Sequence, residues 1–189
     1  RRTFPDLAHH TVWHPENPSA ELDRIIADPA PSGDPTLYIQ HAAATDPLAR
    51  LDGRSALYVL TPVPPLKDRR WWLEHRAEYR AATIRRVCSR TGLRPEEIEV
   101  QEDWTPLEFE SEQHCHEGSI FALAASFFQS AYFRPGVRSS DIHNAYFAGG
   151  GAQPGGGIPL VLLSGYIASR AILADLGRTL PPSEAGRIT

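Results

Sequence analysis

The chain has 189 residues, 41% of them hydrophobic, which is typical of a globular protein with one domain or parts of two. A net charge of −4 gives no electrostatic reason to expect nucleic acid as a partner. The two cysteines, Cys88 and Cys115, lie far apart and outside any Cys-x-x-Cys motif, so we expect reduced thiols. No signal peptide and no run of about eighteen uninterrupted apolar residues is present, and the sequence therefore predicts no membrane crossing.

The first sixty residues read as short strands with one short helix. Residues 8–14 suit a strand, and residues 20–27 suit a helix that follows Pro18. Residues 36–41 and 55–60 carry the β-branched and aromatic bias of strands, and a turn signal, Asp52 and Gly53, precedes the second. We expect these last two strands to be neighbours in one sheet.

The middle of the chain begins with a long amphipathic helix. Apolar residues recur at helical spacing over residues 68–90, and Gly92 follows as a stop signal. Residues 98–101 alternate like an exposed strand. A capping box with proline at the first helical position starts a short helix at Thr105. The uncharged residues 118–133 suit either ordinary core or the wall of a pocket for a long apolar ligand.

A glycine-rich loop dominates the last third of the chain. Residues 145–148 read as a buried strand, residues 149–157 as a loop with few side chains, and residues 158–176 as a nearly apolar helix covered on most sides. Gly177 is the predicted C-terminal cap of that helix. Residues 179–189 are predicted to be a frayed tail.

The glycine loop has the composition of a ligand-binding segment. A backbone without Cβ atoms can approach a ligand closely, and the free N–H groups at a helix start favour negative charge. The alternative is a flexible linker, but linkers are normally flanked by polar residues and this loop is flanked by apolar ones. The pattern favours contact with an electron-rich, flat or anionic ligand.

Several motifs in sequence order resemble the C-terminal part of the bacterial phytoene desaturase family, flavoproteins that dehydrogenate carotenoids. They are Trp-Thr-Pro at 104–106, Phe109, Gly-Ser-Ile-Phe at 118–121, Gln-Ser-Ala-Tyr-Phe-Arg-Pro at 129–135 and the glycine loop. Earlier motifs fit the same family: His-His-Thr-Val at 9–12, Thr-Asp-Pro at 45–47 and Leu-Tyr-Val-Leu-Thr-Pro-Val-Pro at 57–64. The resemblance covers nearly the whole chain.

The resemblance implies an α/β fold that is part of a two-domain FAD-dependent oxidoreductase. Residues 1–140 would form a portion of the substrate-binding domain, an α+β unit with a mixed sheet and helices. Residues 141–178 would be the returning strand, loop and helix of a Rossmann-like FAD-binding domain, and residues 179–189 a flexible tail. The Gly-x-Gly-x-x-Gly motif of the family has no counterpart here, and no methionine occurs. We therefore expect a C-terminal fragment of a longer chain, inactive alone.

FAD is the cofactor that the resemblance implies. Backbone N–H groups at Gly156, Gly157 and Ile158 would stabilise negative charge on the reduced flavin, and Gly149 and Gly150 would lie near its ribityl and pyrophosphate part. The predicted cofactor-binding residues are Gly149, Gly150, Gly155, Gly156, Gly157, Ile158 and Pro159. No catalytic residue is predicted.

The sequence departs from the family pattern at the loop. The family usually has Thr-His or Ser-His before the Pro-Gly of this loop, where this chain has Ala152 and Gln153, and it commonly has glycine where this chain has Leu160. The substrate is therefore phytoene or another polyene, and a hydroxycarotenoid desaturase, isomerase or oxygenase stays open. A non-catalytic binding module for apolar ligands is the alternative from another class.

The remaining predictions concern metals and partners. His114, Cys115 and His116 lack a second ligand cluster at useful spacing, so no metal site is predicted. Arg134 could face the cofactor or pair with a carboxylate. The arginine-rich helix at 68–90 could lie on anionic lipid, although a solvated face paired with glutamates is the simpler interpretation. The resemblance implies a lipid-soluble polyene substrate, a quinone or oxygen as electron acceptor, and a cytoplasmic protein bound peripherally to the membrane.

Overall fold

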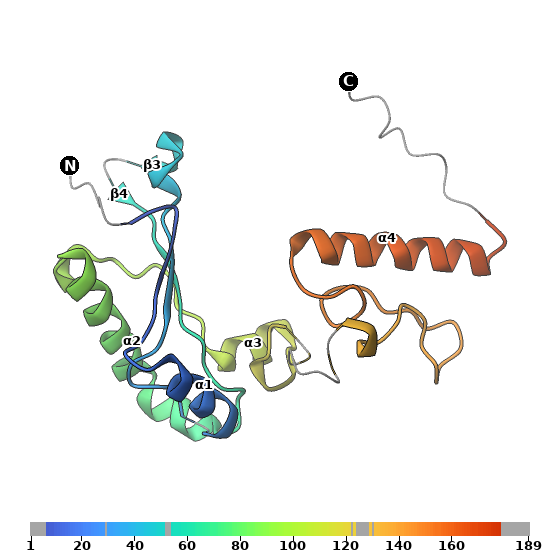
Figure 1. Ribbon diagram of the computed structural model, residues 1–189, viewed down its shortest axis with the longest axis horizontal. Coiled ribbons are helices and arrows are strands. Elements are labelled where there is room, and N and C mark those ends of the chain that lie inside the picture. Colours follow the sequence, from blue (N-terminus) through green and yellow to red (C-terminus); the bar gives the residue numbers. More distant parts are fainter. Residues whose placement is uncertain are drawn as a thin grey trace. The chain divides into compact units, whose positions relative to one another are not determined.

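The computed structural model describes residues 7–28, 30–51, 54–121, 123, 129 and 131–178. The chain divides into two compact units, Arg1–Gly118 and Ser119–Thr189, which we call the N-terminal unit and the C-terminal unit (Figure 1). Helices and a small antiparallel sheet are both present, which agrees with the predicted mixed class of fold. The predicted domain boundary near residue 140 concerns a larger protein and stays a prediction.

Three strands form the sheet of the N-terminal unit. Strands β1 (His10–Trp13), β2 (Leu37–Gln40) and β5 (Tyr58–Leu60) pair antiparallel in the order β1-β2-β5 (Figure 1). The predicted strands at 8–14 and 36–41 are confirmed, and the two predicted neighbours do pair, with Ile39 opposite Val59. The strand predicted at 55–60 is correct only for its last three residues, because β5 begins at Tyr58 and Arg54–Ser55 form a separate strand.

Shorter elements occur in both units. Strands β3 (Arg50–Leu51) and β4 (Arg54–Ser55) form a two-stranded hairpin, and the turn predicted at 52–53 lies outside the described residues. Single turns of 3-10 helix occupy Ala42–Ala44, Pro47–Ala49, Pro95–Glu97, His116–Gly118 and Ala131–Phe133.

Helix α1 (Pro18–Ala27) begins two residues earlier than predicted. The side chain of Asn17 accepts a hydrogen bond from the Ala20 amide and caps the helix, with proline at its first position. Glu21 is buried, and its carboxylate accepts hydrogen bonds from the amide and the hydroxyl of Thr36 at 2.5 and 2.6 Å. This pair fixes α1 to the start of β2.

Helix α2 (Arg69–Thr91) covers one face of the sheet, as Figure 1 shows. Asp68 caps its start by accepting from the Trp71 amide, and Gly92 ends it in the left-handed region at φ 68°. The predicted helix and its stop signal are confirmed. Val87 packs against the fully buried Leu37 and Ile39, so this contact forms the main core of the N-terminal unit.

Helix α3 (Pro106–Gln113) packs near the start of α2. Its predicted capping box is present. The Thr105 side chain accepts a hydrogen bond from the backbone of Glu108, and the Glu108 carboxylate accepts one from the Thr105 amide. Leu107 joins Leu66 and Trp72 in a second buried cluster. Arg76 of α2 adds a polar link, because its guanidinium donates to the carboxylate of Glu108 at 2.5 Å. The two helices are therefore joined by apolar and ionic contacts.

One strand predicted in the N-terminal unit is wrong. Residues 98–101 are not a strand and have no ladder partner in the part of the chain that the structure describes, although Ile98 is extended and packs against the main core. Alternation of side chains made the segment look like a strand, but a strand also needs a neighbour with free backbone groups.

The C-terminal unit consists of an irregular segment followed by helix α4 (Ile158–Asp175). The buried strand predicted at 145–148 is wrong: its ladder contact is a single bridge between Arg138 and Tyr146, and Phe147 is exposed. The predicted closing helix is confirmed in its bounds, and Gly177 follows it at φ 67° with its amide bonded to Ala174. The predicted tail at 179–189 lies outside the described residues.

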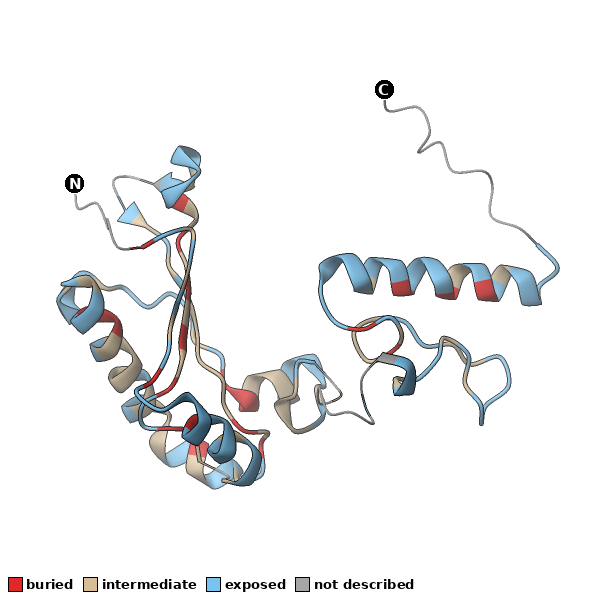
Figure 2. Cartoon of the chain, viewed as in Figure 1, coloured by how far each residue is buried: buried red, intermediate tan, exposed pale blue. Residues whose placement is uncertain are grey.

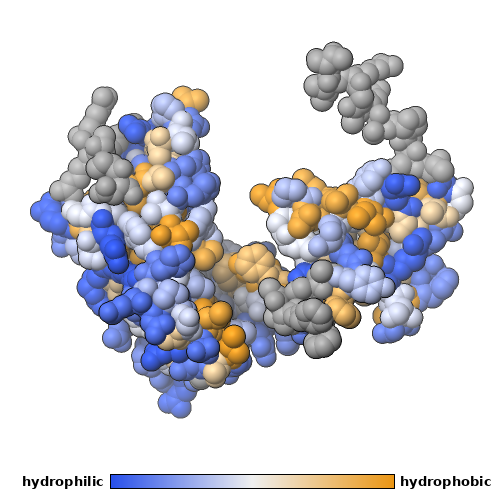
Figure 3. Space-filling model, viewed as in Figure 1, coloured by the Kyte–Doolittle hydropathy of each residue, from blue (hydrophilic) through white to orange (hydrophobic). Residues whose placement is uncertain are grey.

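Helix α4 is much more exposed than predicted. Its buried residues are Ser164, Ala168 and Ala171, while large apolar side chains make up much of its exposed surface (Figures 2 and 3). The exposed apolar residues are Ile158, Leu160, Leu162, Leu163, Tyr166, Ile167 and Ile172. By length and composition alone α4 could cross a membrane, a property that core helices of soluble proteins share. The prediction that the protein crosses no membrane stays a prediction.

Candidate functional site

The glycine loop, residues 149–157, has a backbone that requires glycine. Gly149, Gly155 and Gly157 have φ values of 106°, 129° and 106°. Residues with a Cβ rarely adopt such values, so the glycine content follows from the shape of the loop. No heavy atom of the described residues lies within 4 Å of an ideal Cβ at Gly149 or Gly157. Open space therefore borders the loop backbone at both of its ends.

The loop leads directly into an uncapped helix start. Gly157 is the N-cap residue of α4, and no side chain among the described residues caps this end. Hydrogen bonding within α4 begins with the Val161 amide, which donates to the Gly157 carbonyl at 2.9 Å. The amides of Ile158 and Leu160 have no acceptor inside the helix, and the helix dipole adds partial positive charge there. An electron-rich group at this end would meet hydrogen-bond donors and a favourable field.

Ser164 fixes the first residue of the loop. Its hydroxyl accepts a hydrogen bond from the Gly149 amide at 3.1 Å, and its side chain is fully buried. Ser164 lies almost two turns into α4, so this bond holds the entrance of the loop against the helix that the loop starts. Ala152, also buried, closes the loop further by donating from its amide to the Gly149 carbonyl at 3.2 Å.

Gln153 holds the other side of the loop. Its side-chain amide donates to the carbonyls of Tyr132 and Arg134, both at 3.1 Å, and its backbone amide donates to the Pro135 carbonyl at 2.9 Å. Three hydrogen bonds from one residue therefore attach the loop to residues 132–135. The Arg134 guanidinium donates in return to the Gly150 carbonyl.

This arrangement bears on one of the two sequence interpretations of Arg134, the pairing with a carboxylate, and contact with a cofactor stays a prediction. The hydrogen bond found for its side chain runs to a backbone carbonyl of the loop, not to a carboxylate. Its Nε lies 3.9 Å from an ideal Cβ at Gly155, so the cation lies beside the glycine loop. Arg134 therefore supplies positive charge next to the open backbone and also fixes the position of the loop.

The far end of α4 is held by an ionic contact. Arg138 donates to both carboxylate oxygens of Asp175 at 2.9 Å, and Tyr146 donates to one of them at 2.7 Å. The hydrogen bonds from Arg138 and then from Tyr146 lower the pKa of Asp175 to about 2. The same contact with Asp175 raises the pKa of the Tyr146 hydroxyl. This cluster ties the irregular segment to the last turn of α4.

The structure brings together all seven predicted cofactor-binding residues, because they form the loop and the first turn of α4. Their role in binding a cofactor stays a prediction. Gln153 and Ser164 were not predicted as anchors of the loop. Gln153 carried a signal, since it stands where the family usually has histidine, but nothing in the sequence pairs Ser164 with Gly149.

Sulfur and histidine side chains contribute no cluster to this region. Cys88 and Cys115 are both free thiols, as predicted, and burial raises the pKa of Cys88. Within the described residues, no group of three His, Cys, Asp or Glu side chains could hold a metal ion. His114 ends α3 in the left-handed region at φ 54°, so it serves there as the helix cap.

No family model matches the chain. The 4,4'-diapolycopene oxygenase of Methylomonas sp is 33% identical over 178 residues, 93% of this chain and 36% of that protein. The 4,4'-diapophytoene desaturase (4,4'-diapolycopene-forming) of the same source is 32% identical over 169 residues, 88% of this chain and 33% of that protein. The phytoene desaturase (lycopene-forming) of Pseudescherichia vulneris is 34% identical over 173 residues, 90% and 35% of the two chains.

These similarities confirm the resemblance that the motifs indicated. The chain is related, along nearly all of its length, to carotenoid desaturases and oxygenases. It spans about a third of the length of these curated relatives.

Proposed function

We propose that the chain is part of a flavin-dependent oxidoreductase that modifies a carotenoid or a similar polyene. The observation that carries the proposal is the open glycine loop at the uncapped start of α4. The similarity to carotenoid desaturases and oxygenases supports the substrate class. Both kinds of relative match about equally well, so the proposal covers dehydrogenation and oxygenation alike.

The residues at the loop fit the flavin of FAD. Gly149 and Gly157 leave open space beside the backbone, and the amides at the start of α4 are suitable donors for the electron-rich edge of a flavin. Bound FAD would supply the electron-accepting centre for the polyene. The loop residues would hold it by Gly149, Gly150, Gly155, Gly156, Gly157, Ile158 and Pro159.

The chain's own side chains have a supporting role in this proposal. Gln153 and Ser164 hold the loop in shape by hydrogen bonds to residues 132–135 and to Gly149. Arg134 would add a positive charge near negative charge that develops on a reduced flavin. Preorganised donors of this kind need no rearrangement when charge develops.

The exposed face of α4 fits a buried place in the longer protein. Seven apolar side chains on one helix are costly to leave in water, so we propose that they pack against the sheet of an FAD-binding domain. In that arrangement residues 1–140 belong to the substrate domain and residues 141–178 to the FAD-binding domain. The 189 residues alone would then be inactive.

Partners and location follow from the substrate class. A polyene is soluble in lipid, so we propose a cytoplasmic protein attached peripherally to a membrane, which receives the polyene without passing it through water. A quinone or oxygen would accept the electrons.

The decisive experiment places a side chain on the flavin-facing loop. Gly156 is suitable because its φ lies outside the glycine-only region and an ideal Cβ there meets Phe121 at an ordinary 3.6 Å. In the protein encoded by the whole reading frame, we expect Gly156→Val to abolish flavin retention, measured by visible absorption of the purified protein. Gly136→Val is the matched control, because a Cβ at Gly136 meets nothing within 4 Å among the described residues. Full flavin content and unchanged turnover in Gly156→Val contradict the proposal.

The second candidate is a binding module for apolar ligands without redox chemistry, which the exposed apolar face of α4 favours. It predicts saturable polyene binding to the 189-residue chain without FAD. Mass spectrometry of the polyene separates all three cases: loss of hydrogen indicates a desaturase, gain of oxygen an oxygenase, and an unchanged mass with bound polyene the module.

A further inference from the structure

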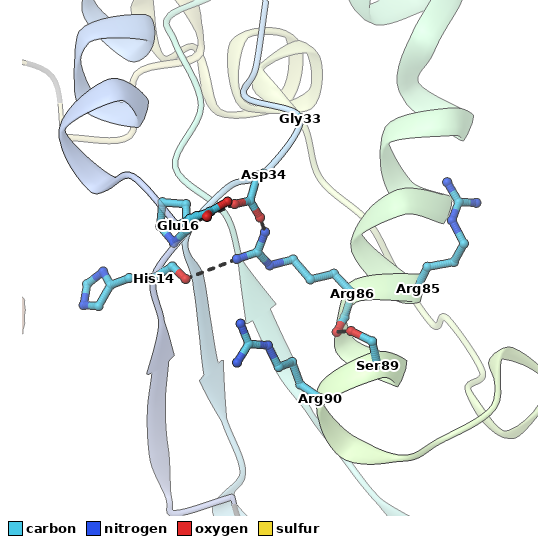
Figure 4. Close-up of a pocket in the computed structure, with 9 residues that line it drawn as sticks. His14, Glu16, Gly33, Asp34, Arg85, Arg86, Ser89 and Arg90 are labelled. Atoms are coloured by element: carbon cyan, nitrogen blue, oxygen red, sulfur yellow. Dashed lines mark hydrogen bonds and ion pairs between the residues drawn. The ribbon is translucent and has the colours of Figure 1, made fainter.

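A hollow in the N-terminal unit contains none of the loop residues. It is open to solvent and has a volume of about 710 Å³, between the end of β1, the turn at Gly33 and Asp34, and the C-terminal half of α2 (Figure 4). Its lining residues are His14, Pro15, Glu16, Gly33, Asp34, Arg85, Arg86, Ser89 and Arg90. The side chains of Arg86 and Arg90 extend toward the hollow, whereas Arg85 points away from it (Figure 4). The lining also holds two carboxylates, Glu16 and Asp34.

Arg86 is the centre of this hollow. Its guanidinium forms an ion pair with Asp34 and donates to the His14 carbonyl at 3.3 Å. The side chain is only 16% exposed, and its buried Nε has no hydrogen-bond partner among the described residues. A buried donor without an acceptor is unfavourable, so the described residues leave the Arg86 guanidinium incompletely satisfied.

Asp34 is committed on both of its oxygens. One oxygen pairs with Arg86, and the other accepts from the Glu16 amide at 3.2 Å. Asp34 therefore has little capacity left to neutralise a second guanidinium. Asp34 therefore does not neutralise the positive charge of Arg90.

Arg90 lies one helical turn beyond Arg86 on the same face of α2. Figure 4 shows its side chain extending toward the strands beneath the Arg86 guanidinium, whereas the Arg85 guanidinium points away from both. No ion pair or hydrogen bond joins the Arg90 guanidinium to another of the described residues. Burial and then the charge of Arg90 lower the pKa of Arg86, so the two cations are close enough to repel.

We propose that this hollow binds the phosphate group of a small anionic ligand between Arg86 and Arg90. Two guanidiniums are suited to the several oxygens of a phosphate, which can accept hydrogen bonds in pairs. The volume leaves room for an organic group attached to the phosphate. The C-terminal dipole of α2 stabilises the cations when the ligand is absent.

The test is calorimetric titration of the 189-residue chain with inorganic pyrophosphate at low ionic strength, where exposed charges are screened least. We expect saturable binding that Arg90→Gln weakens about tenfold or more, the usual effect of losing a charge-assisted hydrogen bond. Arg85→Gln is the matched control, since it removes the same charge one turn away without facing the hollow, and it should change the affinity less than about twofold. Both residues are exposed, so both variants should keep the circular dichroism spectrum of the parent.

Two arms identify the source of the phosphate. Vesicles of phosphatidylglycerol and phosphatidylcholine that bind the parent but not Arg90→Gln, and that pyrophosphate displaces, indicate a lipid headgroup. Binding of pyrophosphate without binding of these vesicles indicates a soluble phosphate compound. Absence of saturable binding to both probes, or equal weakening by Arg90→Gln and Arg85→Gln, overturns the proposal. Flavin retention is not measured here, so this result is independent of the proposed function.

Discussion

The N-terminal and C-terminal units differ in how they bury their apolar residues. In the N-terminal unit, Leu37 and Ile39 of the sheet are fully buried beneath Val87 of α2. In the C-terminal unit, α4 buries Ser164, Ala168 and Ala171, while larger residues such as Leu162 and Tyr166 stay exposed. The first unit therefore has a core of its own. The second has a well-formed helix whose apolar surface is available for another part of a protein.

This difference shows that helix formation and helix burial are separate properties of a sequence. Helix α4 follows from local signals, with proline in its first turn and Gly177 after its end. Its cover has to come from elsewhere, because the described part of the C-terminal unit offers only irregular chain and a single turn of 3-10 helix beside α4. Helix α2 has both properties, because the sheet lies beside it.

Removing part of the core of the N-terminal unit should have the largest effect on the difference between the two units. We expect Ile39→Ala to lower the free energy of unfolding by about 2–5 kcal/mol, because it leaves a cavity beneath α2. Urea denaturation followed by circular dichroism measures this loss. Leu48→Ala is the control: Leu48 is 92% exposed and should change stability by less than about 0.5 kcal/mol. Equal effects of the two variants would mean that the sheet and α2 form no core.

In the C-terminal unit, the most informative change removes the buried hydroxyl of Ser164. Ser164→Ala leaves the Gly149 amide without its acceptor, which costs about 1–3 kcal/mol in local stability. Faster hydrogen exchange at Gly149 and its neighbours measures the effect. Ser169→Ala is the control on the same helix, since that exposed hydroxyl donates to the Tyr166 carbonyl and does not contact the loop. Unchanged exchange at Gly149 in Ser164→Ala would contradict a role for Ser164 in fixing the loop.

The local signals of the N-terminal unit can be tested at the cap of α3. We expect Thr105→Ala to destabilise the unit by about 1 kcal/mol, because the Leu107 amide loses the hydroxyl that it bonds at 3.2 Å. Urea denaturation is again the measurement. Thr105→Ser keeps the hydroxyl and should restore most of the stability. If serine is no better than alanine, the effect comes from packing of the threonine methyl group.

The smallest expected effect concerns the ionic cluster at the end of α4. The pKa of Asp175 is lowered from 3.8 to about 2, first by the hydrogen bonds from Arg138. A carboxyl with a lowered pKa in the folded state stabilises that state above pH 3.8, and the contribution disappears as pH falls through about 2. Carboxyl carbon shifts in an NMR titration should show this midpoint for Asp175. In Arg138→Gln the midpoint should rise toward 3.8, and an unchanged midpoint would exclude Arg138 as the cause.

Much of the fold could be predicted because its signals are local. Asp68 and Gly92 bound α2, and Thr105 with Glu108 starts α3, as their positions in the sequence indicate. The wrong strands at 98–101 and 145–148 have another cause, since a strand depends on a partner that the segment itself does not contain.

The candidate site divides in the same way. The unusual backbone of the loop could be predicted from its glycines, because the positive φ values at 149, 155 and 157 are ones that residues with a Cβ rarely adopt. The anchors could not: Ser164 meets Gly149 fifteen residues away, and Gln153 reaches Tyr132 twenty-one residues away. Such contacts depend on how the segments pack, and the sequence pattern does not contain this information.

Gln153 affects the pH range over which the glycine loop keeps its shape. Its side chain holds residues 132–135 by two donated hydrogen bonds, at a position where the related enzymes usually have histidine. An imidazole gains a proton near neutral pH and changes its donors and acceptors when it does, whereas a carboxamide has no proton to gain in that range. The hydrogen bonds between the Gln153 side chain and residues 132–135 are therefore insensitive to acidification, and any pH dependence of the glycine loop must originate in groups other than residue 153.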